Sequence, residues 1–318
     1  MKLKKLFLTS IAMGAALLMA GCGGKDSSKV IAYSPLTLSN PFFKVIGDSI
    51  EEAAKTFGYE VLILDPNNDP KLQSDQIDDF ISKGVAAIIL VPCDRIGVGQ
   101  SVKAANEAGI PVFTVDAQCA AEGVDIVSHV GTDNFQGGEL AGKAMIEALP
   151  NGGEVLVLDH KIANSCVLRV NGFKKVIDAH NAEVTDESLK LKIVAELPSG
   201  GDNTISYNAT TAQLDAHPDL AGIFAINDPG ALGAYTAVKE KGKEEVIKII
   251  GFDGQKEGKL AIKEGKIYAD PIQFPRQMGT QIVDKIIAHL AGDEVEKTVL
   301  IPTKLYKKAD ADKDPELE

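Results

Sequence analysis

Short apolar runs alternate with amphipathic runs along almost the whole chain. The run "AAIILV" (86–91) is apolar throughout and has the length of a strand, which is typical of a parallel sheet covered on both faces. The run at 41–57 carries apolar side chains every three or four positions with charged side chains between them, which is typical of a surface helix. Repeated strand–helix–strand units of this length predict parallel sheets flanked by helices.

The alternation passes through about five strands and then restarts, so we predict an α/β protein with two similar lobes. The expected strands lie at 30–34, 59–64, 86–91, 111–116, 125–130, 154–159, 191–195, 220–226, 246–253, 267–272 and 298–301. The expected helices lie at 41–57, 71–84, 97–108, 134–148, 164–179, 203–216, 229–241, 255–264 and 275–290. The charged final segment "ADADKDPELE" (309–318) is expected to be frayed.

The first residues form a targeting segment. Lysines at positions 2, 4 and 5 precede an apolar run from Leu6 to Ala20 that is too short for a membrane-spanning helix and is typical of a secretory signal. The small residues before Cys22 resemble the bacterial lipoprotein box, although an ordinary signal peptide with an incidental cysteine is the alternative. We therefore expect a signal peptide at 1–21, lipidation at Cys22 and a tether at 22–28. The body should be anchored to the cell membrane, facing the periplasm or the cell exterior.

The charge of the chain bears on its partners. The formal net charge is −12, and it becomes −15 without residues 1–21, because that segment holds three lysines and no acidic residue. An acidic body of this kind disfavours nucleic acid and anionic lipid as partners.

Hydrogen-bonding side chains and an aromatic pair follow several of the expected strands. Ligands in open parallel sheets bind outside the carboxyl ends of the strands, so these positions form the candidate site. They are Asn40 with Phe42 and Phe43, residues 92–95, Asp116 to Gln118, Asn227 with Asp228, Asp253 with Gly254, and Gln273. Carboxylates and amides bind several hydroxyl groups at once, and a flat ring can cover the C–H face of a sugar or polyol. Simple core packing of the two rings is an equally good interpretation.

The same set argues against catalysis. It contains no histidine, no serine beside a base and no glycine-rich phosphate loop, so we expect neither an enzyme nor a bound cofactor. The segment "DPNNDPKLQ" (65–73) has oxygen ligands at alternate positions but lacks the glycine and the glutamate of a calcium loop, so no metal is expected. Cys93 and Cys119 follow neighbouring strands, and either a disulfide or two small buried thiols would fit; Cys166 is the third cysteine of the body.

The motifs resemble a known family over residues 29–308. They are "LSNPFF", "DFISKGVAAIILVP", "AANEAGIPVFTVD", "VGTDNFQGG", "FAINDPGALGA", "IIGFDG" and the glutamine of "PIQFPRQMG". They resemble the periplasmic sugar-binding proteins of bacterial ABC transporters, of the ribose-binding type. The resemblance implies a type I periplasmic binding protein, with two Rossmann-like lobes joined by three hinge crossings. We expect the N-terminal lobe to comprise 29–132 with 274–302, and the C-terminal lobe 133–273 with 303–318.

The resemblance also implies a set of ligand-binding residues. Residues matching Asn40, Phe42, Phe43, Asp116, Asn227, Asp253 and Gln273 contact sugar in the ribose type. Two arginines and an asparagine of that type are replaced here by Ala117, Val167 and Val91, and the loop "LPSGGDN" (197–203) lacks an aromatic residue. Arg169 either takes over one lost contact or belongs to the helix surface. Tyr207, His160, Lys161 and Arg95 are further candidate substitutes, each with an ordinary surface or loop role as the alternative.

These features together favour a binding protein. We expect a monomer that captures a sugar or polyol between its lobes and delivers it to the permease of an ABC transporter. A protein that presents a sugar or sugar-like signal to a membrane receptor is the alternative. The lac-repressor type of regulator shares the implied fold, but the amino end here is a targeting segment and not a DNA-binding motif.

Overall fold

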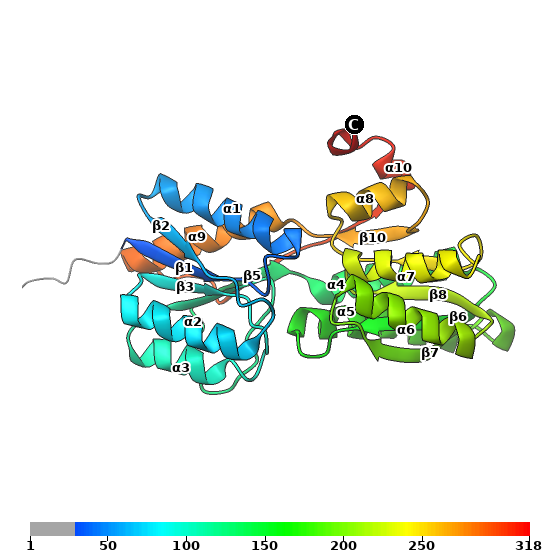
Figure 1. The fold of residues 1–318 in the computed structure, drawn as a ribbon, viewed down its shortest axis with the longest axis horizontal. Coiled ribbons are helices and arrows are strands. Elements are labelled where there is room, and N and C mark those ends of the chain that lie inside the picture. Colours follow the sequence, from blue (N-terminus) through cyan, green and yellow to red (C-terminus); the bar gives the residue numbers. More distant parts are fainter. Residues whose placement is uncertain (1–28) are drawn as a thin grey trace, which may run out of the picture.

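The computed structural model describes residues 29–318, which form two lobes built on separate six-stranded sheets (Figure 1). The predicted signal peptide (1–21), Cys22 and the tether (22–28) lie outside the described residues. Within 29–318, no helix is long and apolar enough to cross a bilayer.

The first lobe contains a wholly parallel sheet with the strand order β11-β5-β4-β3-β1-β2. Figure 1 shows α1 and α9 on one face of this sheet, with α2 and α3 on the other. The elements are β1 Val30–Ser34, α1 Pro41–Thr56, β2 Glu60–Ile63, α2 Pro70–Lys83, β3 Ala87–Leu90, α3 Gly99–Glu107, β4 Val112–Val115, β5 His129–Thr132, α9 Pro275–Ala291 and β11 Thr298–Ile301.

The second lobe has the strand order β12-β10-β9-β8-β6-β7, in which only β12 runs antiparallel to its neighbour. Its elements are α4 Asn134–Ala148, β6 Gly153–Asp159, α5 Asn164–Glu183, η1 Glu187–Leu189, β7 Leu191–Pro198, α6 Asn203–Ala216, β8 Leu220–Ala225, α7 Asp228–Glu240, β9 Lys248–Ile250, α8 Lys256–Lys263, β10 Ala269–Ile272, β12 Lys304–Lys307, α10 Lys308–Ala311 and η2 Pro315–Leu317. The predicted fold class is therefore confirmed: two parallel sheets flanked by helices.

Each sheet has an apolar cluster on both faces, as the continuous apolar strands predicted. Ile31 and Tyr33 of β1 pack toward α1 and α9, whereas Ala32 between them packs toward α2 and α3. In the second sheet, Val155 packs toward α4 and α5, and Leu156 packs toward α6 and α7. Successive strand residues point to opposite faces, so burial on both faces requires apolar residues at consecutive positions.

Polar residues after the strands fix the starts of the helices. Asn40 caps α1 by accepting the Phe42 N–H, with Pro41 at the first helical position, as predicted. Asp69 caps α2 in the same way, and Asp65 accepts the Asn67 N–H. The oxygen-rich segment 65–73 thus supplies a turn and a helix cap.

The chain passes between the lobes three times, after β5, after β10 and after β11. The lobes also meet directly through hydrogen bonds between their loops. The Gln255 side chain donates to Asn40 Oδ1 at 3.0 Å, and the Arg95 N–H donates to the Ile162 carbonyl at 3.3 Å. The Asn164 amide reaches Gln118 Oε1 at 3.4 Å. We call these three contacts the rim contacts; they hold the two lobes closed over the cleft between them.

The structure differs from the sequence predictions in three places. The strand expected at 125–130 lies at 129–132, and β12 was not predicted. The prediction of a frayed C-terminal segment was wrong, because α10 and η2 pack beside α8. The Tyr306 hydroxyl donates to Asp314 at 2.7 Å, and Lys259 pairs with both Asp314 and Glu316. The acidic residues Asp314 and Glu316, which suggested a solvated tail, instead bond to side chains of α8 and β12.

The three cysteines of the body are free thiols. Cys93 and Cys119 therefore do not form the disulfide that was one of the two alternatives. Cys93 is fully buried, and its thiol lies 3.7 Å from the Leu36 carbonyl.

Candidate functional site

A cavity of about 50 Å³ lies between the lobes at the carboxyl ends of the strands. All eight residues that were predicted to bind ligand line it. Three come from the start of α1, one follows β4, one lies on α5, and the others follow β8, β9 and β10: Asn40, Phe42, Phe43, Asp116, Arg169, Asn227, Asp253 and Gln273. We call this cavity the cleft.

Asp116 supplies an unused acceptor to the cleft. Its backbone has a φ of 64°, a left-handed conformation that is uncommon outside glycine, and this conformation turns the chain at the end of β4. The residue is 5% exposed, and its Oδ1 atom has no hydrogen-bond partner among residues 29–318. Burial raises the pKa of Asp116 to about 7, with an opposing effect of Arg169 and a smaller raising effect of Asp253. An acceptor in this state is suited to a ligand hydroxyl.

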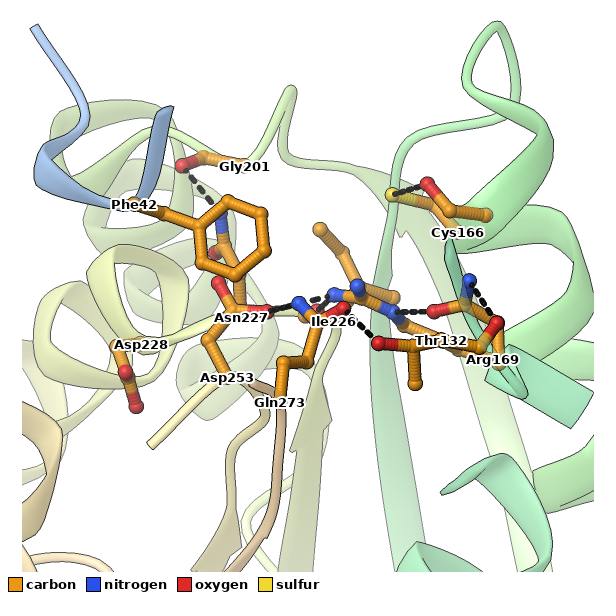
Figure 2. A network of polar contacts seen from close by, with 12 residues as sticks. Phe42, Thr132, Cys166, Arg169, Gly201, Ile226, Asn227, Asp228, Asp253 and Gln273 are labelled. Atoms are coloured by element: carbon orange, nitrogen blue, oxygen red, sulfur yellow. Dashed lines mark hydrogen bonds and ion pairs between the residues drawn. The ribbon is translucent and has the colours of Figure 1, made fainter. Parts of the chain in front are cut away.

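Asp253 anchors a charged network at the floor of the second lobe (Figure 2). Arg169 Nη1 donates to Asp253 Oδ1 at 3.0 Å and to the Ile226 carbonyl at 2.6 Å. The Gln273 amide also donates to Asp253, and the Thr132 hydroxyl donates to Gln273 Oε1 at 2.7 Å. Burial raises the pKa of Asp253, and the bonds from Arg169 and Gln273 oppose that rise. Like Asp116, Asp253 has a positive φ, 97°.

Arg169 belongs to the cleft and not to the helix surface. It is 3% exposed, its Nε donates to Asn134 Oδ1 at 2.8 Å, and its guanidinium lies 3.9 Å from the Phe252 ring centre. Gly138 on α4 permits this placement, because a Cβ atom there would lie 2.0 Å from the Arg169 carbonyl oxygen. The close approach of α4 and α5 thus directs the guanidinium toward the cleft.

Phe42 and Phe43 are packed in the core and also line the cleft. Both belong to the apolar cluster under α1 and α9, with exposures of 2% and 5%, and both line the cleft. Their ring centres are 5.3 Å apart in an edge-to-face arrangement. Figure 2 shows the Phe42 ring beside Asn227 and Asp253.

The two asparagines also hold the walls of the cleft in place. Asn40 Oδ1 accepts from the Phe42 N–H and from Gln255 of the other lobe. Asn227 Oδ1 accepts from Gly230, and its amide donates to the Gly201 carbonyl at 3.0 Å. Each asparagine therefore positions a loop of the cleft, independently of any contact that it makes with a ligand.

Sequence reasoning missed several residues that line the cleft. Gly200, Gly201, Ser165 and Cys166 were not singled out, and His160 was only one of four candidate substitutes. Among those four, His160 alone lines the cleft. Tyr207 donates to Glu240 at 2.6 Å, and Lys161 pairs with Glu196. His160 directly follows β6, so the rule that located the other residues would also have found it.

A second buried carboxyl pair lies behind the cleft. Asp228 and Asp270 are 2% and 0% exposed and interact electrostatically, and Asp228 Oδ2 accepts the Gln255 N–H at 2.7 Å. Burial raises the pKa of Asp228 well above its ordinary value and that of Asp270 to about 6. The folded state therefore favours the protonated form of these carboxyls.

We expect Asp228→Asn to make the protein more stable at pH 8 than the wild type. Both pKa values are raised in the folded state, so the pair's contribution is complete below about pH 4 and is lost as the pH rises through 6 and above. An asparagine amide can donate to Asp270 without a titrating proton. The gain in free energy of unfolding should be on the order of 1–3 kcal/mol at pH 8 and should vanish near pH 4.

Denaturant unfolding at several pH values measures this difference. Asp48→Asn, on the exposed face of α1, serves as the control and should give a difference that is small at every pH. A gain that is independent of pH would contradict the interpretation that burial favours the protonated form of these carboxyls.

Two α/β lobes that close over a cleft lined by carboxylates, amides and aromatic rings define a two-lobed solute-binding protein of the type I periplasmic fold. Comparison with known families identifies it more closely: residues 31–294 match the model described as "Periplasmic binding protein domain". The chain belongs to the periplasmic binding protein family, and it is of the ribose-binding type.

Individual relatives agree with this assignment. The ribose import binding protein of Salmonella typhimurium is 35% identical over 97% of this chain and 100% of its own length. A solute-binding protein from Agrobacterium vitis, solved with bound D-fucose, matches with a TM-score of 0.82 and 31% identity over 91% of this chain and 98% of its own. One from Bacillus halodurans, with bound myo-inositol, matches with a TM-score of 0.81 and 26% identity over 91% and 98%.

Proposed function

We propose that this protein captures one sugar or polyol in the cleft and delivers it to the permease of an ABC transporter. The observation that carries the proposal is the convergence of polar groups from both lobes and two rings on one closed cleft. The unpaired Oδ1 of Asp116 supports it, because that atom lacks a partner that a ligand hydroxyl would supply. Import binding proteins of the same family, and relatives solved with D-fucose and myo-inositol, support the same class of ligand.

Titration calorimetry against D-ribose, D-fucose, myo-inositol and a wider set of pentoses, hexoses and linear polyols tests the proposal. We expect one or a few of these solutes to bind at a single site. Binding of amino acids in place of every sugar and polyol would overturn it. Size-exclusion chromatography with light scattering tests the further expectation that the protein works as a monomer.

We expect Asp116→Ala to weaken binding of the preferred solute tenfold or more. A hydrogen bond to a charged group contributes about 1.5–3 kcal/mol, and tenfold corresponds to about 1.4 kcal/mol. The loss of folding stability should be small, because Asp116 Oδ1 has no protein partner to lose and the main cost is the positive φ, which alanine tolerates less well than aspartate. Calorimetry and thermal unfolding measure the two effects, with Asp48→Ala as the control; unchanged affinity would remove Asp116 from the binding site.

We propose a binding and not a catalytic role for the cleft. Arg169 and Asp253 in the cleft form an ion pair with each other, and burial disfavours the charged form of Asp116. Burial raises the pKa of the Cys166 thiol to about 12, which leaves it a poor nucleophile. Incubation with the preferred solute should therefore return it unchanged, and any turnover would contradict this role.

We also propose that Cys22 anchors the protein to a membrane, on the evidence of the small residues and apolar run that precede it. We expect wild-type protein expressed in a bacterium to incorporate a labelled fatty acid and to sediment with membranes. Cys22→Ser should lose the label, with Cys93→Ser as the matched control. A Cys22→Ser protein that still incorporates the label would refute the anchor.

A further inference from the structure

His160 is fixed in the wall of the cleft by its backbone. It is the first residue after β6, its N–H donates to Asp159 Oδ1 at 2.6 Å, and its carbonyl accepts the Ala163 N–H at 3.2 Å. The next residue, Lys161, points outward and pairs with Glu196 at 2.8 Å. His160 is 8% exposed and lines the cleft from the second lobe, whereas Asp116 lines it from the first.

The side chains of His160 and Asp116 share a property that distinguishes them from the rest of the cleft. His160 Nε2 and Asp116 Oδ1 are both buried without a hydrogen-bond partner. Other unpaired buried atoms occur in residues 29–318, but within that part of the chain only these two belong to residues lining the cleft. A buried polar atom without a partner costs about 1–3 kcal/mol, so two such atoms in residues that line one cavity point to a ligand that pairs with both.

The chemistry of the two groups restricts that ligand. Burial lowers the pKa of His160, so its imidazole is neutral at pH 7. The Nε2 atom of a neutral imidazole accepts or donates a hydrogen bond according to its tautomer. A hydroxyl group can pair with either tautomer, because it both donates and accepts. A carboxylate on the ligand would need a cation at this end of the cleft, and Lys161, the neighbouring cation, is turned away.

We infer that His160 is a specificity-determining residue, which binds one hydroxyl of an uncharged solute while Asp116 binds another from the opposite lobe. The inference rests on the proposed function and narrows its ligand class to sugars or polyols with hydroxyls at both ends of the molecule.

Three variants test the inference. His160→Leu removes Nε2 at similar volume, His160→Gln restores a polar group near its position, and His180→Leu on the same lobe is the matched control. Calorimetry with the solute that binds best among D-ribose, D-fucose, myo-inositol and the wider set gives the affinities. Thermal unfolding of each ligand-free variant separates a structural role from contact with the ligand.

We expect His160→Leu to bind that solute tenfold or more weakly with no fall in melting temperature, and His160→Gln to recover part of the loss. One deoxy analogue of the solute lacks the hydroxyl that His160 binds. Wild type should bind this analogue more weakly than the intact solute, whereas His160→Leu should bind the two with equal affinity. An affinity of His160→Leu within about twofold of wild type would overturn the inference and leave the proposed function standing. If wild type binds no sugar or polyol, the proposed function and this inference both fail.

Discussion

Replacing Arg169 with alanine is expected to cost about 3–5 kcal/mol of folding stability, because it leaves the buried Asp253 carboxylate without its charged partner. The change also removes hydrogen bonds to Asn134 and Ile226 and the contact with the Phe252 ring. Because Arg169 opposes the burial-induced rise in the Asp253 pKa, its loss should raise that pKa further. The destabilisation should accordingly be greater at pH 8 than at pH 5.

Denaturant unfolding of both proteins at the two pH values measures this effect. Arg276→Ala provides the control, since the Arg276 side chain is 69% exposed and its pairing with Glu52 spans 3.6 Å. That variant should change stability by less than about 1 kcal/mol. A loss of similar size in the two variants would show that the Arg169–Asp253 pair does not hold the second lobe together.

The second large effect concerns the aromatic pair. Phe42→Ala and Phe43→Ala should each lower the free energy of unfolding by about 3–5 kcal/mol, because both rings are buried in the cluster under α1 and α9. The ring that stacks on the ligand should in addition weaken binding by about 1–2 kcal/mol. Both rings line the cleft, so the measurement decides between them.

Unfolding and calorimetry on the same preparations separate the two contributions. Phe57→Ala, at the exposed end of α1, is the control and should alter neither quantity strongly. If the folded fraction of both variants bound the solute with wild-type affinity, the pair would be core alone. If Phe42→Ala lost affinity and Phe43→Ala did not, the stacking ring would be Phe42.

The residues that follow strands could be predicted because topology alone brings them together. The carboxyl ends of parallel strands meet at one edge of a sheet, so Asp116, Asn227, Asp253 and Gln273 converge on the cleft although they are far apart in sequence. The alternation of apolar and amphipathic runs likewise sufficed for the fold, because each apolar strand must be covered on both faces.

Residues on helices and in the tail could not be assigned in this way. Arg169 is buried because Gly138 lets α4 approach α5 and because Asp253 lies beneath it, and neither fact is local to Arg169. The charges of 309–318 indicate solvent exposure unless Lys259, far earlier in the chain, is known to lie beside them. In both cases the deciding partner comes from tertiary packing.

The rim contacts allow selectivity and tightness of binding to vary independently. Gln255 bonds to Asn40 across the lobes, and the Arg95 N–H bonds to the Ile162 carbonyl. Both contacts therefore contribute to the equilibrium between open and closed forms. A ligand held by both lobes is retained in proportion to the closed fraction, and a weaker rim lowers the apparent affinity for every solute by the same factor. Substitutions at Gln255, Gln118 or Asn164, which do not line the cleft, would therefore change the affinity for every solute while the residues that contact the solute stay unchanged.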